Sequence, residues 1–427
     1  MRGLRVAWLA ATLGAGGAAC VDRATSPGTC PGFCPSGAID VVDAVLGTSV
    51  TRDSAFRGYV FPYQAMAMTA ADVPGVVDSR AILRTSALVS GLALNTGDTT
   101  TSPLVGADSL KLTLTITRRD TAAHNLTLKL YRLPPTIDST TTSADLQSAF
   151  ADSLRAVNVD ALLAKPGGVD SATGDQAAID TTSKFLKVTL KLDSLQAPPS
   201  GDLYVPGDSG KLGIGVGVGA DAPTSVAFCT RENACGASVA WFVKFDSIKG
   251  TDTTLIHKQL AAVTLFDSYV FDPPNLPLDS TLAVGGAPSA RSILRVTLPR
   301  AIRDSSQIIR ATLILVPAAP ARGARADSFV VEAHTVLADF GAKSPLVLDA
   351  TRTDTTMIRV DKKDTVRIEV TNLLQFWVAD STRPEVLMLR SQGEGGQPGE
   401  IRFYPSAAAY RPALRITYAR RFPFGEP

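Results

Sequence analysis

The sequence predicts an all-β protein of two tandem jelly-roll-like antiparallel β-sandwiches, with one short helical insertion in the first. Apolar and polar residues alternate along much of the chain, as between Leu110 and Ile116. This period of two is typical of a strand with one buried face. The segment Arg-Ala-Ile-Leu-Arg at 80–84 recurs almost unchanged as Arg-Ser-Ile-Leu-Arg at 291–295. Because 427 residues are too many for one ordinary core, the repetition indicates two copies of one domain.

Composition excludes some classes of partner. The hydrophobic content of 45% is enough to build two cores, and the formal net charge is only +2. A chain so nearly neutral gives no electrostatic reason to expect nucleic acid. The three histidines are far apart in the sequence, and no spacing typical of a metal site or a cofactor occurs. Asp-bearing turns at 272–279 and 361–364 could hold Ca²⁺ through oxygen ligands, but solvated turns are the favoured interpretation. We therefore expect no metal ion and no cofactor.

The N-terminus resembles a bacterial export signal. Arg2 and Arg5 precede a short apolar run, and small residues then lead to Cys20. Gly-Ala-Ala-Cys at 17–20 resembles a lipobox, in which the cysteine becomes the lipidated mature N-terminus. We expect a signal peptide at 1–19, and a lipid anchor at Cys20 followed by a Pro/Gly/Ser-rich tether to residue 37. Gly17 departs from the usual Leu, so ordinary cleavage after Ala19 is the alternative.

The other four cysteines form two close pairs, Cys30 with Cys34 and Cys229 with Cys235. In an exported protein, such pairs are candidates for local disulfides. A metal site would need both pairs to meet in space, with three and five residues between their cysteines and no histidine close in sequence. We therefore favour disulfides.

The first domain is expected at 38–250. Its strands include a hairpin with apolar alternation at 110–116 and at 126–130, and a strand at 212–218 with glycine at every second position. Packing of another element against those glycines is the favoured interpretation, with a ligand as the alternative. Leu146, Phe150, Leu154 and Val157 recur at helical spacing, which predicts a helical insertion near 144–163.

The second domain is expected at 262–419, after a short polar link at 246–262 and before a tail at 420–427. Short apolar segments separated by turn residues predict its strands, as in a sandwich or jelly roll. We expect these strands at 263–271, 291–298, 308–316, 328–335, 366–371, 386–390, 400–404 and 413–418.

The second domain resembles the DNRLRE-type domain, a bacterial extracellular β-sandwich related to a family of carbohydrate-binding modules. The most specific matching segment is Val-Thr-Asn-Leu-Leu-Gln-Phe-Trp at 370–377, followed by Glu-Val-Leu-Met-Leu-Arg at 385–390. Further matches are Asp-Ser-Tyr-Val at 267–270, Leu-Ala-Val-Gly-Gly at 282–286, 291–296 and 311–315. The first domain matches more loosely. Because the family's tryptophan-containing stretch is missing from both halves, the resemblance implies the fold and an extracellular setting but no ligand-binding residues.

One motif pair is similar to a serine-protease signature. Thr-Ala-Ala-His at 121–124 and Gly-Asp-Ser-Gly at 207–210 stand in the order of the chymotrypsin-like family. Lys211 replaces the second glycine of that family, which would crowd the oxyanion position, and His124 lies in a predicted turn. Two polar turns explain these motifs better than a triad of Ser209 and His124.

Aromatic residues are the remaining candidates for ligand contact. Trp241 and Trp377 lie in apolar runs, so we expect both in the cores. Tyr404 and Tyr410 are predicted to lie at the surface near one loop. The ligand-binding residues are not identified by the sequence.

The sequence therefore predicts a non-catalytic bacterial envelope lipoprotein, held at the outer membrane or cell surface by its lipid anchor. We expect a surface binding module, and the resemblance implies carbohydrate as a ligand. The alternative is a structural or adhesion lipoprotein that binds envelope proteins. A serine hydrolase is a remote alternative.

Overall fold

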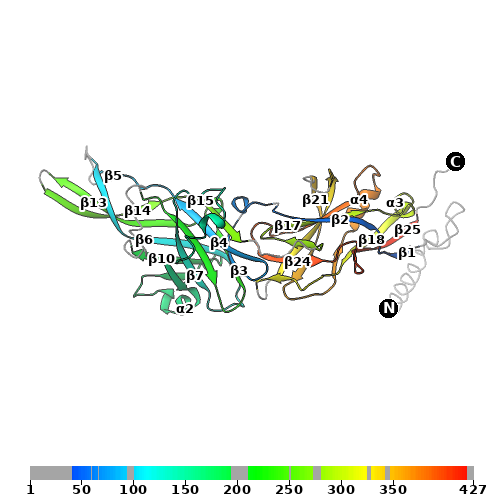
Figure 1. Ribbon diagram of the computed structural model, residues 1–427, viewed down its shortest axis with the longest axis horizontal. Helices are drawn as coiled ribbons and strands as arrows, with labels where there is room; N and C mark the ends of the chain where they lie inside the picture. The colour runs from blue at the N-terminus through cyan, green and yellow to red at the C-terminus, as the bar shows by residue number, and fades with distance from the viewer. Residues whose placement is uncertain are drawn as a thin grey trace, which may run out of the picture.

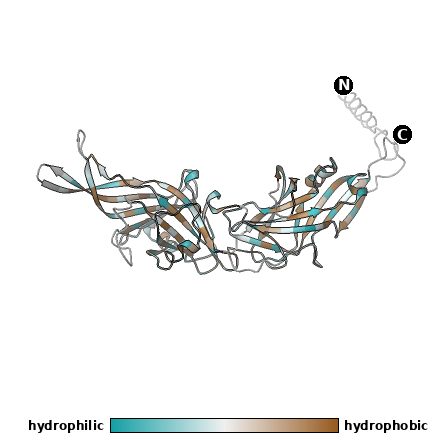
Figure 2. Ribbon diagram, turned by 45° about the horizontal axis from the view of Figure 1, so that its top comes forward, coloured by the Kyte–Doolittle hydropathy of each residue, from teal (hydrophilic) through white to brown (hydrophobic). Residues whose placement is uncertain are grey.

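Strands dominate the computed structural model, which confirms the all-β prediction (Figure 1). The residues that it describes are 41–58, 60–65, 67–93, 101–193, 210–249, 252–272, 280–324, 328–341 and 347–420. Within them, all paired strands are antiparallel, and they form two bodies placed end to end. Hydrophobic stretches concentrate in the interiors of both bodies (Figure 2).

The C-terminal sandwich has one sheet of four strands and one of eight. The smaller sheet has the order β1 (Val41–Leu46), β25 (Ala413–Arg420), β18 (Ser306–Leu315), β22 (Val366–Glu369). The larger sheet has the order β19 (Arg322–Gly323), β24 (Gly399–Phe403), β16 (Leu282–Gly285), β17 (Ala290–Val296), β23 (Val386–Ser391), β20 (Ser328–Ala338), β21 (Val347–Arg359), with β2 (Val50–Arg57) also paired to β17. Leu294, Trp377 and Phe403 belong to the core of this sandwich. Two short helices are α3 (Arg300–Arg303) and α4 (Thr371–Val378).

The N-terminal sandwich encloses a separate core that includes Leu83, Leu112 and Trp241. Its main strand order is β14 (Asp252–Ala262), β13 (Ser238–Lys249), β6 (Ser102–Arg119), β12 (Thr224–Cys229), β3 (Ala67–Val73), β4 (Val77–Thr85), β11 (Gly213–Gly219), β7 (Thr127–Leu133), β8 (Arg155–Asn158). Off this path, β5 (Gly91–Leu92) and β10 (Leu186–Asp193) pair with β6, β9 (Gln176–Ile179) pairs with β10, and β15 (Thr264–Asp272) pairs with β4.

Strand pairing divides the chain differently from the sequence prediction. Strand β1 pairs with β25, and β2 pairs with β17, so residues 41–57 complete the C-terminal sandwich. Strand β15 pairs with β4 and belongs to the N-terminal sandwich. The expected boundaries at 38 and 262 are therefore corrected, because the N-terminal sandwich (67–272) is inserted into the C-terminal one. The strands that carry Phe56 and Phe266 have exchanged places, because each pairs with the Arg-x-Ile-Leu-Arg strand of the other copy.

The expected polar link at 246–262 is also corrected. Residues 252–262 form β14, which pairs with β13 along its whole length, from Lys249 opposite Asp252 to Val239 opposite Ala262. This hairpin projects at the end of the molecule opposite β1 and β25 (Figure 1). The sequence did not predict this strand because β14 is largely exposed. It carries polar residues such as Thr and Lys and shows no alternation of apolar and polar residues.

The expected helix near 144–163 is replaced by a 3-10 turn (η3, Ala144–Leu146), strand β8 and the short helix α2 (Val159–Leu163). Leu146, Phe150 and Val157 are buried as expected, but Val157 lies in the strand. Strand β8 extends the sheet edge at β7, and this pairing outweighs the helical spacing of the sequence.

Aromatic side chains pack over two glycines of β11, one ring from this insertion and one from β7, which confirms the packing interpretation. A Cβ atom at Gly215 would approach Cε1 of Phe150 to 2.7 Å, and one at Gly217 would approach Cε2 of Tyr131 to 3.3 Å. The two rings pack edge to face, with centroids 5.2 Å apart. The missing side chains therefore make room for two aromatic rings.

A glycine-rich loop (residues 393–399) of the C-terminal sandwich forms much of the junction between the two bodies. The Tyr269 hydroxyl of β15 donates a hydrogen bond to the Gly395 carbonyl oxygen, and burial raises the pKa of this tyrosine. Thr69 and Arg118 both donate to the Gly396 carbonyl oxygen, at 2.9 and 3.2 Å. Gly395 has φ +83°, and a Cβ there would approach the Val60 side chain to 2.8 Å. Strands β23 and β24 are not neighbours in their sheet, so the loop is a crossover connection and not a hairpin loop.

The inserted arrangement predicts which fragments fold. Residues 67–272 contain every strand of their sandwich and should unfold cooperatively in urea. A fragment of 262–419 should fail to do so, because it lacks β1 and β2 and leaves their partners unpaired. Joining 41–57 to 280–420 through a short Gly/Ser linker should restore cooperative unfolding, followed by circular dichroism. Cooperative unfolding of 262–419 alone would contradict the inserted arrangement.

Gly215→Ala should destabilise the protein by about 1–3 kcal/mol, the usual range for overpacking a core. The new methyl group would meet the Phe150 ring, which is 7% exposed and has little room to move. In a Phe150→Leu background the same substitution should cost less. Gly219→Ala is the control, because a Cβ there meets nothing within 4 Å. Urea unfolding compares all these variants with the wild-type protein, and an equal effect at both glycines would exclude the packing explanation.

Candidate functional site

The two Arg-x-Ile-Leu-Arg strands build the sandwiches, as expected. Leu83 and Leu294 lie in the two main cores, whereas the neighbouring isoleucines are buried on the opposite faces. In the second copy, Arg291 pairs with Glu394 through two hydrogen bonds of 2.7 Å, and Arg295 pairs with Asp339 at 2.7 and 2.9 Å. Both guanidinium groups of the second copy are therefore already engaged by carboxylates.

The first copy holds its arginines differently. Arg80 lies over the rings of Tyr131 and Phe150, with its guanidinium carbon 5.8 and 4.6 Å from their centroids. It also approaches Asp78 at 3.3 Å. Arg84 lies 5.9 Å from the centroid of Phe266. These contacts support packing rather than ligand binding.

The described cysteines confirm one predicted disulfide. Cys229 and Cys235 are bonded, with their Cα atoms 5.6 Å apart, and they close the turn between β12 and β13. Cys20, Cys30 and Cys34 lie outside the described residues. Lipidation and the first disulfide stay predictions.

The motif similar to a serine protease does not form a described site. His124 is exposed in the turn between β6 and β7. Its backbone N–H donates to Oδ1 of Asp221 at 2.7 Å, and its carbonyl oxygen accepts from the Asp221 backbone at 3.0 Å. Asp221 therefore holds the turn through its backbone, not the imidazole as in a triad. Ser209 lies outside the described residues.

Both tryptophans are in the cores, as predicted. Trp241 is 0% and Trp377 is 1% exposed, and Trp377 Nε1 donates to the Thr335 hydroxyl at 2.8 Å. Tyr404 and Tyr410 lie together, with ring centroids 5.6 Å apart, and Tyr410 is exposed. They are surface aromatics, as expected, but they line none of the described pockets.

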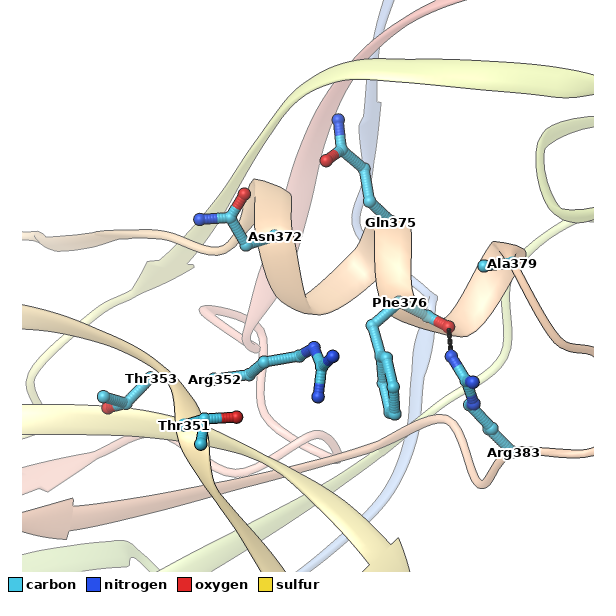
Figure 3. Close-up of a pocket in the computed structure, with 8 residues that line it drawn as sticks. All are labelled: Thr351, Arg352, Thr353, Asn372, Gln375, Phe376, Ala379 and Arg383. Atoms are coloured by element: carbon cyan, nitrogen blue, oxygen red, sulfur yellow. Dashed lines mark hydrogen bonds between the residues drawn. The ribbon is translucent and has the colours of Figure 1, made fainter.

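A pocket of about 510 Å³ lies between β21 and α4 (Figure 3). Its only aromatic side chain among the described lining residues, Phe376, lies between two guanidinium groups, with the carbons of Arg352 and Arg383 at 4.1 and 3.6 Å from the ring centroid. Arg352 pairs with Asp349, and Arg383 with Asp380 at 3.3 Å. Hydrogen bonds from Thr351 and Arg352 lower the pKa of Asp349. Both faces of the ring and both charges are therefore already engaged.

A second pocket, of about 620 Å³, lies on the outer face of β6, β13 and β14, beside β9 and β10. We call it the Phe242 pocket. Ten described residues line it: Asp108, Ser109, Lys111, Gly174, Gln176, Lys191, Phe242, His257, Lys258 and Gln259. The lining thus combines one aromatic ring with amide, hydroxyl and ammonium groups. This is the composition of a small-molecule binding site.

Strand geometry explains how Phe242 reaches this pocket. Trp241 points into the core, so the next residue of β13 points outward, where its side chain is half-buried. Gln259 and Ser109 are its cross-strand partners. Lys111 Nζ lies 5.5 Å from the ring centroid, a distance at which the ring attracts a cation. The sequence analysis missed Phe242, although the alternation around Trp241 could have placed it outside.

Asp108 is the acidic residue among the described lining residues, and its carboxylate contacts two basic side chains. Lys244 Nζ lies 2.6 Å from one carboxylate oxygen, and His257 Nδ1 lies 2.8 Å from the other. The hydrogen bond from Lys244, assisted by His257, lowers the pKa of Asp108. The carboxylate is therefore ionised at neutral pH and is a poor proton donor.

In the described part of the chain, no cluster of three or more His, Cys, Asp or Glu side chains could hold a metal ion. No helix among the described residues is long and apolar enough to cross a membrane.

Comparison with known proteins adds no family. No protein-family model matches the chain, and no curated protein is significantly similar to it. The resemblance to DNRLRE-type domains therefore stays a prediction.

Proposed function

We propose that this chain is a non-catalytic envelope lipoprotein of bacteria that binds carbohydrate in the Phe242 pocket. The signal-like segment at 1–19 and Cys20 support export and lipidation. The elongated form also supports the proposal, because β1, which follows the N-terminal segment, lies at one end and the β13–β14 hairpin at the other (Figure 1). A lipid at Cys20 would leave the N-terminal sandwich as the part farther from the membrane.

The observation that carries the proposal is the half-buried Phe242 ring in a polar pocket. A pyranose ring has an apolar face of C–H groups that packs on an aromatic ring, and hydroxyl groups at its rim that need hydrogen-bond partners. Gln176, Gln259 and Ser109 offer such partners around Phe242. The pocket between β21 and α4 fits this chemistry less well, because Arg352 and Arg383 cover its Phe376 ring.

One observation favours the alternative of a protein-binding lipoprotein. Strand β14 is an edge strand, paired only with β13, and its Leu255 is exposed. An open edge of this kind can accept a strand from a partner. Pull-down of envelope proteins that is lost in Leu255→Lys, with no binding to glycans, would favour this function.

A glycan array tests the proposed function. The protein lacking residues 1–20 should bind at least one class of polysaccharide, and Phe242→Ala should abolish that binding by removing the stacking surface. Tyr410→Ala is the matched control, because it removes an exposed aromatic ring from the other sandwich and should leave binding unchanged. Equal thermal unfolding of the variants would show that the fold is intact. The absence of binding to every glycan would contradict the proposal.

Cys20→Ser should abolish lipidation and move the protein from the membrane fraction to the soluble fraction. Fatty-acid labelling followed by cell fractionation measures both effects. Cys30→Ser is the control, because it changes a cysteine that is expected in a disulfide and should keep the label. A Cys20→Ser protein that still carries the label would disprove the assignment.

A further inference from the structure

We propose that the Phe242 pocket selects an acidic polysaccharide, one whose sugar rings carry carboxylate groups. The inference rests on the proposed glycan-binding function and adds the charge of the ligand. It comes from the distribution of lysines around the ring, in a protein whose formal net charge is only +2.

The described lining has a surplus of positive charge. Lys111, Lys191 and Lys258 line the pocket, and the acidic residue among the described lining, Asp108, is already paired with Lys244 and His257. Lys191 approaches Asp193 only at 3.7 Å. In the described part of the chain, no carboxylate lies within 4.0 Å of the ammonium group of Lys111. Lys258 lies opposite the buried Val243, so its side chain leaves the other face of the sheet, and Lys111 and Lys191 are the lysines on the face of Phe242.

The strand register places two of these lysines against each other. Lys191 of β10 lies directly opposite Lys111 of β6. Like charges in directly opposed positions destabilise a sheet. The same two strands place Thr189 opposite Thr113, whose hydroxyls are 3.0 Å apart, a favourable pair. An anion between Lys111 and Lys191 would turn the one unfavourable pair into two charge-assisted contacts.

The aromatic ring limits what this anion can be. Lys111 Nζ lies 5.5 Å from the Phe242 ring centroid, so a sugar stacked on the ring would bring a ring substituent close to the ammonium group. A carboxylate on the sugar satisfies both groups at once. An anionic membrane surface fits less well, because the pocket is on the sandwich farther from β1, the end that the proposed lipid anchor would hold.

A matched pair of ligands tests the charge. Polygalacturonate and its methyl-esterified form share one sugar backbone and differ in the carboxylate. The full-length protein, purified in detergent, should bind the ester about a hundredfold more weakly, because the ester loses the charge-assisted contacts with both lysines, each worth about tenfold. Raising the salt concentration should weaken binding to the acid form and leave the ester unchanged. Isothermal titration calorimetry measures both.

Variants assign the effect to the opposed lysines. Lys111→Gln and Lys191→Gln should each weaken binding to polygalacturonate about tenfold, with no effect on the ester. Both should keep or raise the midpoint of thermal unfolding, because each removes a like-charge repulsion. Lys187→Gln is the matched control: it lies four residues earlier on β10, is exposed and does not line the pocket. Its binding should be unchanged.

The outcomes separate this inference from the proposed function. Equal binding of acid and ester, dependent on Phe242, would overturn the preference for acidic sugars and leave carbohydrate binding in place. Equal weakening by Lys187→Gln would overturn the assignment to the pocket. Binding to vesicles with anionic lipid headgroups but to no glycan of the array would overturn both proposals.

Discussion

The fold depends on strand pairs that join the beginning of the chain to its end. Residues 41–46 pair with 414–419, and residues 50–57 pair with 290–296. Asp43 and Arg415 add an ion pair at 2.6 Å across the first of these contacts. The C-terminal sandwich therefore cannot be completed until the last strands are present, whereas the inserted sandwich contains all its own strands. Such long-range pairing has a high entropic cost of loop closure, so the outer sandwich is expected to form last.

Side-chain hydrogen bonds hold the two bodies together, in addition to the two segments of chain that pass between them. Tyr269, Thr69 and Arg118 of the inserted sandwich all donate to carbonyl groups of one loop. Glu394 of the same loop accepts two hydrogen bonds from Arg291, the first residue of the second Arg-x-Ile-Leu-Arg segment. The arginines of the first copy lie over aromatic rings instead. One strand motif is thus stabilised in two ways, and the second copy is coupled to the junction through Glu394.

Local patterns in the sequence predicted strands well and pairing poorly. Alternation placed the strands of the second half, such as β18 and β25, within a few residues of their observed bounds. Largely exposed strands were missed, since β14 and β21 are rich in Thr and charged residues and show little apolar alternation. The exchange of β2 and β15 could not be predicted, because local patterns do not show which strands pair over such long separations in the sequence. The Phe242 pocket needed the register of five strands, which local sequence does not fix.

The position of β1 has a mechanical consequence. This strand is the first described segment and lies at the edge of its sheet, paired only with β25. A protein held by its N-terminus and by a ligand at the far sandwich would transmit tension through β1. Such a pull, directed along the strand, would load all six residue pairs with β25 together, as in shear, instead of opening them one after another. The attachment between the chain's two ends would then set the force at which the molecule yields.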